Sequence, residues 1–531
     1  MTEAQNNVSA ILQGDMPPVR ILPDIVTRQV EIRPDKIALH FEGAALTYSE
    51  LDKGSSKTGQ GLISLDVKPN DRVGYLGKNS HIYFELLFGV AKAGGVICPI
   101  NWRLALPEIL YVLNDCIPRV LFVGIEFIDL IPDIIADSDT IEHIIPMEAA
   151  EGFDTHYEAW RDAFEALPTA VKREPSDDAI QMYTSGTTGH PKGAVLSNRS
   201  ILTPYQRFRT DPSPEYNVWY ESDVSLIPMP VFHVGGTAWG LTTMGNGATG
   251  VIMRNFVPTD VLGYIHKYKI SKLFLVPAAI QIVVNQDNVR DVDFSQMKYI
   301  FYGASPMPVP LLAKAIDVFG CGFAQFYGMT ETSGSITALP PEDHDVNGNE
   351  RMRSVGKPLL GVEIAIWDDN ENELPTGEIG EIVTRSTMNM NGYWENPQAT
   401  RETITKDGWL KTGDVGIIDS DGYLFLKDRK KDMIISGGEN VYPAEVENVL
   451  YGHPKIEEAA VIGVPDSKWG EAVKACIVLK KNENLDDEEL ISWTRERLAG
   501  FKCPKSVEYL DVLPRNPSGK VLRRKLRELY I

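Results

Sequence analysis

The sequence predicts an α/β protein. We expect a large N-terminal domain of doubly wound α/β subdomains with a small β-rich subdomain, followed by a small, mobile α+β C-terminal domain. The chain has 531 residues, which is too long for one hydrophobic core. Short apolar runs alternate with helical patterns through the first two thirds, as in doubly wound layers. From about Gly356 onward the pattern changes to short strands and turns.

Helix and strand signals are clear in the N-terminal part. Thr47-Tyr-Ser-Glu50 has the spacing of a capping box, in which each side chain satisfies a backbone N–H at the start of a helix. Asn79-Ser80 is placed to cap an amphipathic helix over residues 81–93, and Gly94-Gly95 is placed to end it. Buried strands are predicted at residues 96–100, 272–276 and 298–302.

The C-terminal part has a different organisation. Strands at 378–383 and 422–426 belong to the predicted β-rich subdomain, at about 350–429. The charged segment 428–432 indicates a boundary, so we expect domains over 1–429 and 430–531. The second of these contains a predicted strand at 459–464, a helix at 486–498 and a strand at 507–513.

Composition excludes several classes of protein. With 52 basic and 73 acidic residues the formal charge is −21, which argues against a protein that resides on nucleic acid or on an anionic membrane. Five cysteines without a Cys-x-x-Cys pair argue against a disulfide framework or a structural zinc site. The sequence contains neither a signal-peptide pattern nor an apolar run long enough for a transmembrane segment. We therefore expect a soluble, cytoplasmic protein.

The strongest local motif is Tyr183-Thr-Ser-Gly-Thr-Thr-Gly-His-Pro-Lys-Gly193. Its glycines allow a tight turn whose N–H groups point inward, which forms a cradle for oxyanions. Hydroxyl side chains add donors, and Lys192 adds a positive charge. The loop differs from a Walker A motif, because Pro191 precedes the lysine and Gly193 follows it.

The string resembles the signature of the AMP-forming adenylating superfamily, and in particular its fatty-acid and aryl-acid CoA ligases. The resemblance continues in the same order to Lys520. The further matching motifs are Pro230-Val-Phe-His233, Tyr302-Gly-Ala-Ser305, Tyr327-Gly-Met-Thr-Glu331, Gly377-Glu-Ile-Gly380, Lys411-Thr-Gly-Asp414, Asp428-Arg429, Ser436-Gly-Gly-Glu-Asn440 and Pro517-Ser-Gly-Lys520. The resemblance implies ATP-dependent activation of a carboxylic acid to acyl-AMP, followed by transfer of the acyl group to CoA, with Mg²⁺ as cofactor.

The resemblance also implies the residues that bind ATP and AMP. These are Thr184, Ser185, Gly186, Thr187, Thr188, Gly189, Lys192, Gly303, Ala304, Ser305, Tyr327, Gly328, Met329, Thr330, Asp414, Arg429 and Lys520. Glu331 is the implied Mg²⁺ ligand, with Thr188 beside it. A carboxylate suits this hard cation, although Thr-Glu at a helix start also favours the helix dipole. The implied catalytic residues are Thr184, Lys192, His233, Glu331 and Lys520.

Three further groups of residues follow from the same resemblance. The acid pocket comprises His233, Val234, Gly235, Gly236, Trp239, Tyr302, Gly303, Gly328, Met329 and Ser333. The CoA-binding segment comprises Ser436, Gly437, Gly438 and Glu439. Lys431 is the implied hinge, about which the small domain rotates between the two half-reactions. A lone histidine is more often structural, but the motif favours a gating role for His233.

The acid itself is left open. The lining is apolar and contains no acidic residue from Pro228 to Thr243, which disfavours an amino acid. A medium- or long-chain fatty acid is the first choice, and aryl, arylalkanoic and sterol side-chain acids are alternatives. Remoter alternatives are an acyl-AMP ligase that loads a carrier protein and an inactive acyl-binding paralogue. A homodimer is also open, as is control by a lysine acetyltransferase and deacetylase acting on Lys520, because Pro514 to Lys520 resembles an acetylation pattern.

Overall fold

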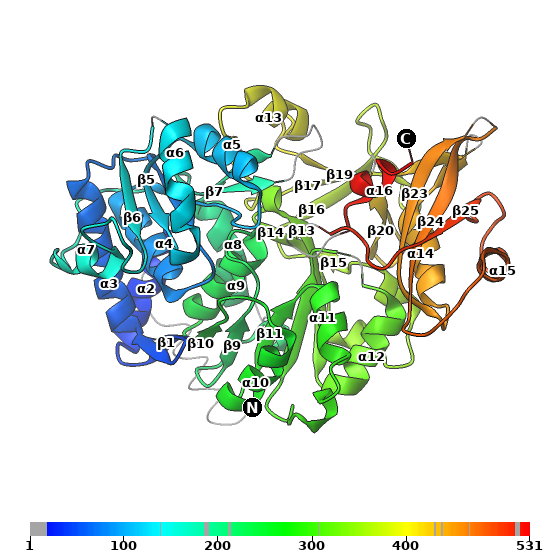
Figure 1. The fold of residues 1–531 in the computed structure, drawn as a ribbon, viewed down its shortest axis with the longest axis horizontal. Helices are drawn as coiled ribbons and strands as arrows, with labels where there is room; N and C mark the ends of the chain where they lie inside the picture. The colour runs from blue at the N-terminus through cyan, green and yellow to red at the C-terminus, as the bar shows by residue number, and fades with distance from the viewer. Residues whose placement is uncertain are drawn as a thin grey trace.

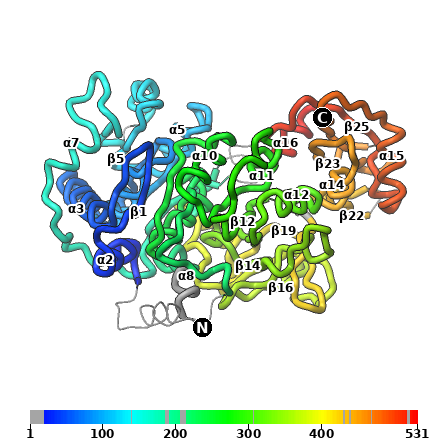
Figure 2. The backbone as a smooth tube through the Cα atoms, turned by 90° about the horizontal axis from the view of Figure 1, so that it is seen from below, coloured from blue at the N-terminus to red at the C-terminus, as the bar shows by residue number. Residues whose placement is uncertain are grey.

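The computed structural model describes residues 19–138, 140–184, 191–210, 214–305, 307–429, 432–436, 439–466, 468–515 and 521–530. In this part of the chain four sheets are combined with helices. The predicted mixed α/β fold, with a large N-terminal domain and a small C-terminal one, is confirmed. Figures 1 and 2 both place the small domain at the opposite end of the molecule from the N-terminal helices.

A seven-stranded sheet lies at the N-terminal end of the molecule (Figure 1). Its order is β18 (Gly392–Tyr393), β8 (Lys192–Ser197), β7 (Asp178–Thr184), β4 (Val96–Pro99), β3 (Arg72–Leu76), β5 (Pro118–Val123) and β6 (His143–Pro146). The strands from β7 to β6 pair in parallel, whereas β7–β8 and β8–β18 are antiparallel. The antiparallel β7–β8 pair encloses the predicted phosphate loop.

A nine-stranded sheet forms the centre of the large domain. Its order is β15 (Lys357–Pro358), β14 (Gly334–Leu339), β13 (Gly322–Met329), β12 (Tyr299–Gly303), β11 (Lys272–Leu275), β9 (Val224–Ile227), β10 (Thr249–Ile252), β1 (Ile37–Phe41) and β2 (Ala44–Thr47). The strands from β13 to β1 are parallel, and antiparallel strands flank them at both edges. Two of the predicted strands, 272–276 and 298–302, are β11 and β12.

Helices cover both sheets. They are α2 (Leu22–Ile32), α3 (Tyr48–Ser64), α4 (His81–Ala93), α5 (Leu106–Cys116), α6 (Ile131–Asp137), α7 (Tyr157–Asp162), α8 (Asn198–Thr210), α9 (Val234–Gly245), α10 (Pro258–Tyr268), α11 (Pro277–Val284), α12 (Val309–Phe319) and α13 (Pro397–Thr403). The predicted capping box is confirmed at the start of α3, where Thr47 and Glu50 bond each other's backbone N–H.

Helix α4 has the predicted bounds but not the predicted exposure. Ser80 Oγ accepts from the N–H of Tyr83 at 3.3 Å, and Gly94 ends the helix in the left-handed region at φ 84°. The expectation of an amphipathic helix is wrong, because nearly every residue between the two caps is buried. Helices α2 and α3 and strands β1 and β4 all pack against it, so that no broad face remains for solvent.

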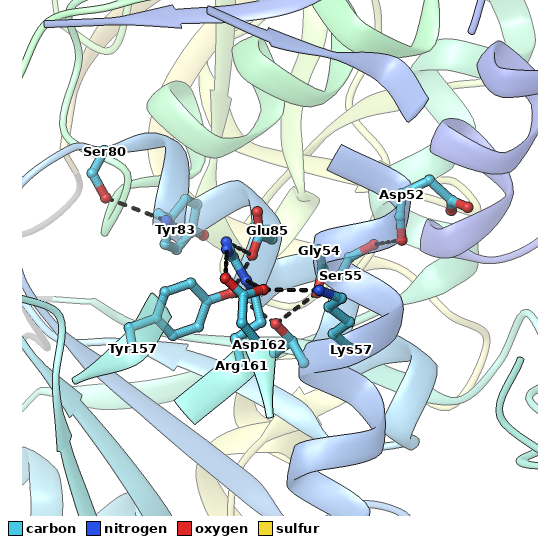
Figure 3. Close-up of polar contacts among 11 residues, drawn as sticks. Asp52, Gly54, Ser55, Lys57, Ser80, Tyr83, Glu85, Tyr157, Arg161 and Asp162 are labelled. Atoms are coloured by element: carbon cyan, nitrogen blue, oxygen red, sulfur yellow. Dashed lines mark hydrogen bonds and ion pairs between the residues drawn. The ribbon is translucent and has the colours of Figure 1, made fainter. Parts of the chain in front are cut away.

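A buried carboxylate joins α4 to α7 (Figure 3). Glu85 Oε1 accepts hydrogen bonds from the Tyr157 hydroxyl at 2.7 Å and from Arg161 Nη1 at 2.8 Å. Glu85 is 1% exposed, and this burial raises its pKa. Gly54 of α3 makes room for the carboxylate, since a Cβ there would lie 2.4 Å from Glu85 Oε2. The cluster therefore fixes three helices around one paired charge.

A four-stranded antiparallel sheet follows Gly356, as expected for the β-rich subdomain. Its order is β16 (Glu363–Trp367), β17 (Gly380–Arg385), β19 (Leu410–Ile418) and β20 (Leu424–Arg429). Asp414 lies within β19, and β20 ends at Arg429, at the predicted domain boundary. The boundary itself, between residues 429 and 430, stays a prediction.

The small domain contains a five-stranded sheet and three helices in the described residues. They are β21 (Ile434–Ser436), β22 (Glu439–Val441), β23 (Ile456–Asp466), β24 (Gly470–Leu479), β25 (Ser506–Tyr509), α14 (Pro443–Tyr451), α15 (Asp487–Arg495) and α16 (Arg523–Arg527). The strand predicted at 507–513 ends earlier than expected, at Tyr509. Gln281 of α11 donates to Glu457 Oε1 at 3.1 Å and so joins the large domain to β23. No described helix has the length and apolarity needed to cross a membrane.

Candidate active site

The predicted site residues gather at one edge of the nine-stranded sheet. Strands β9, β11, β12 and β13 are parallel neighbours, so their carboxyl ends meet at this edge. His233 follows β9, Gly303 ends β12 and Tyr327 lies near the end of β13. In doubly wound folds, ligands bind outside the carboxyl ends of parallel strands. Motifs that are separated in the sequence therefore lie close together in space.

The two ends of the predicted phosphate loop face each other. Thr184 of β7 pairs with Lys192 of β8, and Thr184 Oγ1 lies 3.5 Å from the Lys192 carbonyl oxygen. Several predicted residues lie outside the described part of the chain: Ser185, Gly186, Thr187, Thr188, Gly189, Lys431, Gly437, Gly438 and Lys520. Of the predicted ATP-binding residues in this loop, the structure therefore describes Thr184 and Lys192.

The base of this hairpin is held by a chain of polar contacts. The Tyr183 hydroxyl donates to Asp115, and it accepts from Gln181 Nε2 at 3.0 Å. Gln181 Oε1 accepts in turn from Arg72 Nε at 3.0 Å, and the Arg72 guanidinium lies 3.4 Å from the centre of the Trp394 ring. Trp394 Nε1 donates to the carbonyl oxygen of Asp115 at 3.0 Å, which closes the network. A closed network of this kind fixes the strand that leads into the loop.

Glu331 and Lys192 both contact one residue that no sequence motif marked. Glu331 is 6% exposed, and its Oε1 accepts from the Tyr393 hydroxyl at 2.8 Å. Lys192 Nζ lies 5.1 Å from the centre of the same tyrosine ring, which is within the range of a cation–π contact. An ammonium and a carboxylate around one ring suit a polyphosphate that arrives with a divalent cation.

A second pair of predicted residues meets at the junction of two sheets. The Tyr327 hydroxyl donates to Asp414 Oδ2 at 2.8 Å, and Asp414 is 6% exposed. Asp414 also pairs through its backbone with Arg429 across β19 and β20. A carboxylate fixed beside an aromatic ring can bind hydroxyl groups of a ligand whose planar part lies on that ring.

The backbone at this edge is tightly packed and partly strained. A Cβ on Gly328 would lie 1.9 Å from the carbonyl oxygen of Gly334, and one on Gly303 would lie 2.2 Å from that of Phe326. Ala304 and Ser333 have φ values of 66° and 52°, in the left-handed region that non-glycine residues seldom adopt. Such strain clusters at functional sites, where the surrounding fold maintains it.

His233 begins helix α9 in a shielded position. Its ring centre lies 4.5 Å from that of Phe232, and within the described residues Nε2 is buried and has no hydrogen-bond partner. Burial, and to a smaller extent the positive charge of Arg103, lower the pKa of His233 to about 4. The imidazole is therefore neutral near pH 7, and a buried nitrogen is available to a ligand.

The two glycines after His233 have different surroundings. A Cβ on Gly236 would lie 2.3 Å from the carbonyl oxygen of Pro230, so this glycine allows close packing of α9. A Cβ on Gly235 would meet only the Phe274 ring, at an ordinary 3.4 Å. Of the two, only Gly235 leaves space for a ligand.

One of the predicted acid-pocket residues, Trp239, lies in a cluster of aromatic side chains. Trp239 is 8% exposed, and its ring centre lies 5.1 Å from that of Phe301 and 5.4 Å from that of Trp219. Its Nε1 donates to the Leu226 carbonyl oxygen at 3.0 Å, which fixes the ring. Tyr302 lies deeper in the core, where its hydroxyl is 3.0 Å from His344 Nε2. The other predicted lining residues, Val234, Gly328 and Met329, are half-buried.

The small domain reaches the same edge. A cavity of about 100 Å³ is lined by Pro277 and Ser305 of the large domain and by Arg515 and Val521 of the small one. Arg515 and Val521 form an isolated β-bridge, and they flank residues 516–520. Ser436 and Glu439, two of the predicted CoA-binding residues, pair with each other in the small-domain sheet.

The described residues fit a hard divalent cation held mainly by substrate. Glu331 provides one buried carboxylate, and no group of three or more His, Cys, Asp or Glu side chains forms a metal cluster in the described ranges. Mg²⁺ is typically held by one or two carboxylates together with water and substrate phosphates. The donor set around Glu331 matches that pattern.

The sequence and the fold both match known proteins. The model of the AMP-binding enzyme family matches residues 26–394, and that of the AMP-binding enzyme C-terminal domain matches residues 445–520. A fatty acid–[acyl-carrier-protein] ligase of Streptomyces coeruleorubidus is 38% identical over 97% of each chain. A feruloyl-CoA synthase of an Amycolatopsis species is 36% identical over 95% of this chain and 98% of the relative.

Solved structures agree with these relatives. An anthranilate CoA ligase in complex with anthranoyl-AMP superposes with a TM-score of 0.88, at 28% identity over 97% of this chain and 98% of the other. A fatty acyl CoA synthetase of Mycobacterium tuberculosis gives a TM-score of 0.76, at 32% identity over 96% and 98% of the two chains. The chain therefore belongs to the AMP-binding enzyme family and is an adenylate-forming acid–thiol ligase.

Proposed function

We propose that the chain is an ATP-dependent acyl-CoA synthetase that works on an apolar carboxylic acid with Mg²⁺ and changes its domain arrangement between two half-reactions. The observation that carries this proposal is a pair of side-chain contacts, one between the seven-stranded sheet and Glu331 and one between the nine-stranded and four-stranded sheets. Tyr393 contacts both Lys192 and Glu331, and the Tyr327 hydroxyl donates to Asp414. Cationic, carboxylate and aromatic groups are thus placed for the phosphates, the metal and the nucleoside of ATP.

In the first half-reaction a carboxylate oxygen of the acid attacks the α-phosphorus of ATP. The bond from that phosphorus to the bridging oxygen of pyrophosphate breaks, and acyl-AMP remains. Both reactants are anions, so Lys192 and Lys520 offset their repulsion. Asp414 binds the ribose hydroxyls, and Glu331 holds Mg²⁺, which neutralises phosphate charge when bound. The position of Arg515 and Val521 beside Ser305 supports an approach of Lys520 from the small domain.

In the second half-reaction the CoA thiolate attacks the carbonyl carbon of acyl-AMP. The carbon–oxygen bond to the phosphate breaks, so a thioester and AMP are formed. Lys520 must leave the site before the pantetheine arm enters, and a rotation about Lys431 accomplishes this. The same rotation carries Ser436 and Glu439 toward the thiol. His233, neutral and shielded, changes position between the two steps.

A medium- or long-chain fatty acid is the first candidate substrate. Two named relatives act on fatty acids, and the predicted pocket is lined with apolar and glycine residues. An aryl or arylalkanoic acid is the second candidate. It is favoured by the ring cluster of Trp239, Phe301 and Trp219, and by relatives named as feruloyl-CoA synthase and indoleacetate–CoA ligase.

A carrier-protein thiol is a second candidate for the acceptor. The relative with 38% identity is named as a ligase that uses an acyl-carrier protein. That protein and this chain match over 97% of both lengths, so the likeness includes the small domain. CoA remains the first candidate, because several other relatives are named as CoA ligases.

One assay tests acid and acceptor separately. ATP–pyrophosphate exchange is measured with a panel of fatty, aryl and amino acids and no thiol, and thioester is then measured with CoA or with a phosphopantetheinylated carrier protein. We expect exchange with apolar acids and a thioester with CoA. Exchange that is followed by neither thioester would contradict the acid–thiol assignment. Absence of exchange with every acid in the panel would contradict adenylation itself.

A further inference from the structure

A short segment links the phosphate-loop strand to Glu331 without belonging to either motif. Strand β18 pairs with β8 through Gly392–Val195 and Tyr393–Ala194. On its N-terminal side the Met390 N–H donates to the Glu331 carbonyl oxygen at 2.8 Å. On its C-terminal side the Trp394 N–H donates to the carbonyl oxygen of Gly193 at 2.7 Å. Tyr393 lies between these two anchors.

Tyr393 contacts two opposite charges with two different parts of its side chain. Its hydroxyl donates to Glu331 Oε1 at 2.8 Å, while its ring lies 5.1 Å from Lys192 Nζ. A hydroxyl is a hydrogen-bond donor to a carboxylate, and the face of an aromatic ring attracts a cation. The same residue therefore contacts both charges.

Removal of this side chain has a predictable consequence. A lysine and a glutamate in a partly buried site attract each other strongly, because the effective dielectric constant is low. If they paired directly, the ammonium would be lost to the phosphates and the carboxylate to the metal. The hydroxyl bond to Oε1 also restricts the orientation of the carboxylate.

We propose that Tyr393 is a positioning residue that holds Lys192 and Glu331 apart, so that each charge meets its ligand instead of the other charge. The proposal rests on the proposed roles of these two residues with ATP and Mg²⁺. Tyr393 acts through them and need not touch a reacting atom.

The segment is held well enough for side-chain variants to be informative. The Tyr393 N–H donates to Thr400 Oγ1 at 2.9 Å, and the Asn391 N–H donates to the Val195 carbonyl oxygen at 2.8 Å. These backbone bonds do not depend on the tyrosine side chain. Tyr393→Phe keeps the ring and removes the hydroxyl, whereas Tyr393→Leu removes both.

The experiment measures binding of an ATP analogue that cannot react, α,β-methylene-ATP, by calorimetry as Mg²⁺ is titrated. Mg²⁺ should increase the affinity for the analogue. We expect Tyr393→Phe to raise the Mg²⁺ concentration that gives half of this increase about tenfold, which is the ratio for loss of one hydrogen bond to a charged group. The affinity for the analogue in the absence of metal should be unchanged. Tyr393→Leu also loses affinity in the absence of metal, since Lys192 then pairs with Glu331.

Tyr423 supplies a matched control. Its hydroxyl donates to Asp343 Oδ2 at 2.7 Å, and Lys357 Nζ lies 4.4 Å from its ring centre, so it makes the same two kinds of contact elsewhere. Tyr423→Phe should leave the Mg²⁺ titration unchanged. An identical titration for Tyr393→Phe and the unaltered chain would overturn the inference alone. If the unaltered chain does not bind the ATP analogue, or binds it equally well with and without Mg²⁺, the proposed function and this inference are both overturned.

Discussion

The Tyr327 hydroxyl lies 2.8 Å from Asp414 Oδ2 and joins β13 of the nine-stranded sheet to β19 of the four-stranded sheet. The two residues are far apart in the chain, and each belongs to a separate sequence motif. Their contact means that the proposed nucleoside site lies at a junction between two sheets. A shift of the β-rich subdomain would therefore change nucleotide affinity directly.

Loss of the Asp414 carboxylate should weaken ATP binding more than loss of the tyrosine hydroxyl. We expect Asp414→Ala to lower ATP affinity at least about tenfold and Tyr327→Phe to lower it by about threefold to tenfold, since the phenol bond only orients the carboxylate. Calorimetry measures both. The control is Tyr48→Phe, which removes a buried hydroxyl bonded to the carbonyl oxygen of Ala248 at 2.8 Å. Equal loss of affinity in this control would count against a specific nucleotide role.

Lys192 should matter to catalysis in a way that another ring-bound lysine does not. We expect Lys192→Met to slow ATP–pyrophosphate exchange by about 10²-fold to 10³-fold, the range for loss of one preorganised group that stabilises transition-state charge. Lys357→Met removes a lysine that lies 4.4 Å from the Tyr423 ring and should change exchange little. Similar exchange rates for the two variants would contradict the phosphate role of Lys192.

The neutral state of His233 predicts a loss of stability in acid. Its pKa falls from 6.5 to about 4 in the folded chain. Between these two pH values the imidazole is protonated in the unfolded chain but neutral in the folded chain. Stability therefore falls as pH drops from about 6.5 toward 4, by up to about 3 kcal/mol. The free energy of unfolding, measured by urea denaturation at several pH values, should depend less steeply on pH for His233→Asn. An unchanged slope would show that other groups account for the acid sensitivity.

The Glu85 cluster should contribute more to stability than an exposed ion pair. Arg161→Leu leaves the buried Glu85 carboxylate without its charged partner, and we expect a loss of about 3 kcal/mol in the free energy of unfolding. The matched control is Arg385→Leu, which breaks a pair with Glu363 whose side chains are 43% and 58% exposed. That change should cost less than about 1 kcal/mol. Equal losses in urea denaturation would contradict this ranking.

The two half-reactions should be separable by opposite variants of the small domain. Lys431→Pro restricts φ at the proposed hinge, so it should spare acyl-AMP formation and abolish thioester formation. Lys520→Met, or acetylation of Lys520, should abolish acyl-AMP formation and spare thioester formation from supplied acyl-AMP. Single-turnover measurements of each half-reaction decide the matter. Equal losses of both steps in either variant would argue against domain alternation.

Local sequence signals were sufficient wherever the responsible groups are neighbours in the chain. The Ser80 cap and Gly94 define α4, and the Thr47–Glu50 box begins α3, because each signal satisfies backbone groups within one helical turn. Where partners come from elsewhere, local patterns failed. The burial of α4 on nearly all sides depends on α2, α3, β1 and β4, and the early end of β25 at Tyr509 depends on its pairing with β24.

The sequence by itself therefore determined the fold class, the family and most of the candidate site residues, since motifs of a few adjacent residues carry that information. Only the tertiary structure decided how the charges are arranged. Nothing near Tyr393 in the sequence indicates that its hydroxyl meets Glu331 and its ring meets Lys192. These contacts exist because β18 pairs with β8, and strand pairing between distant segments is set by the topology of the whole domain.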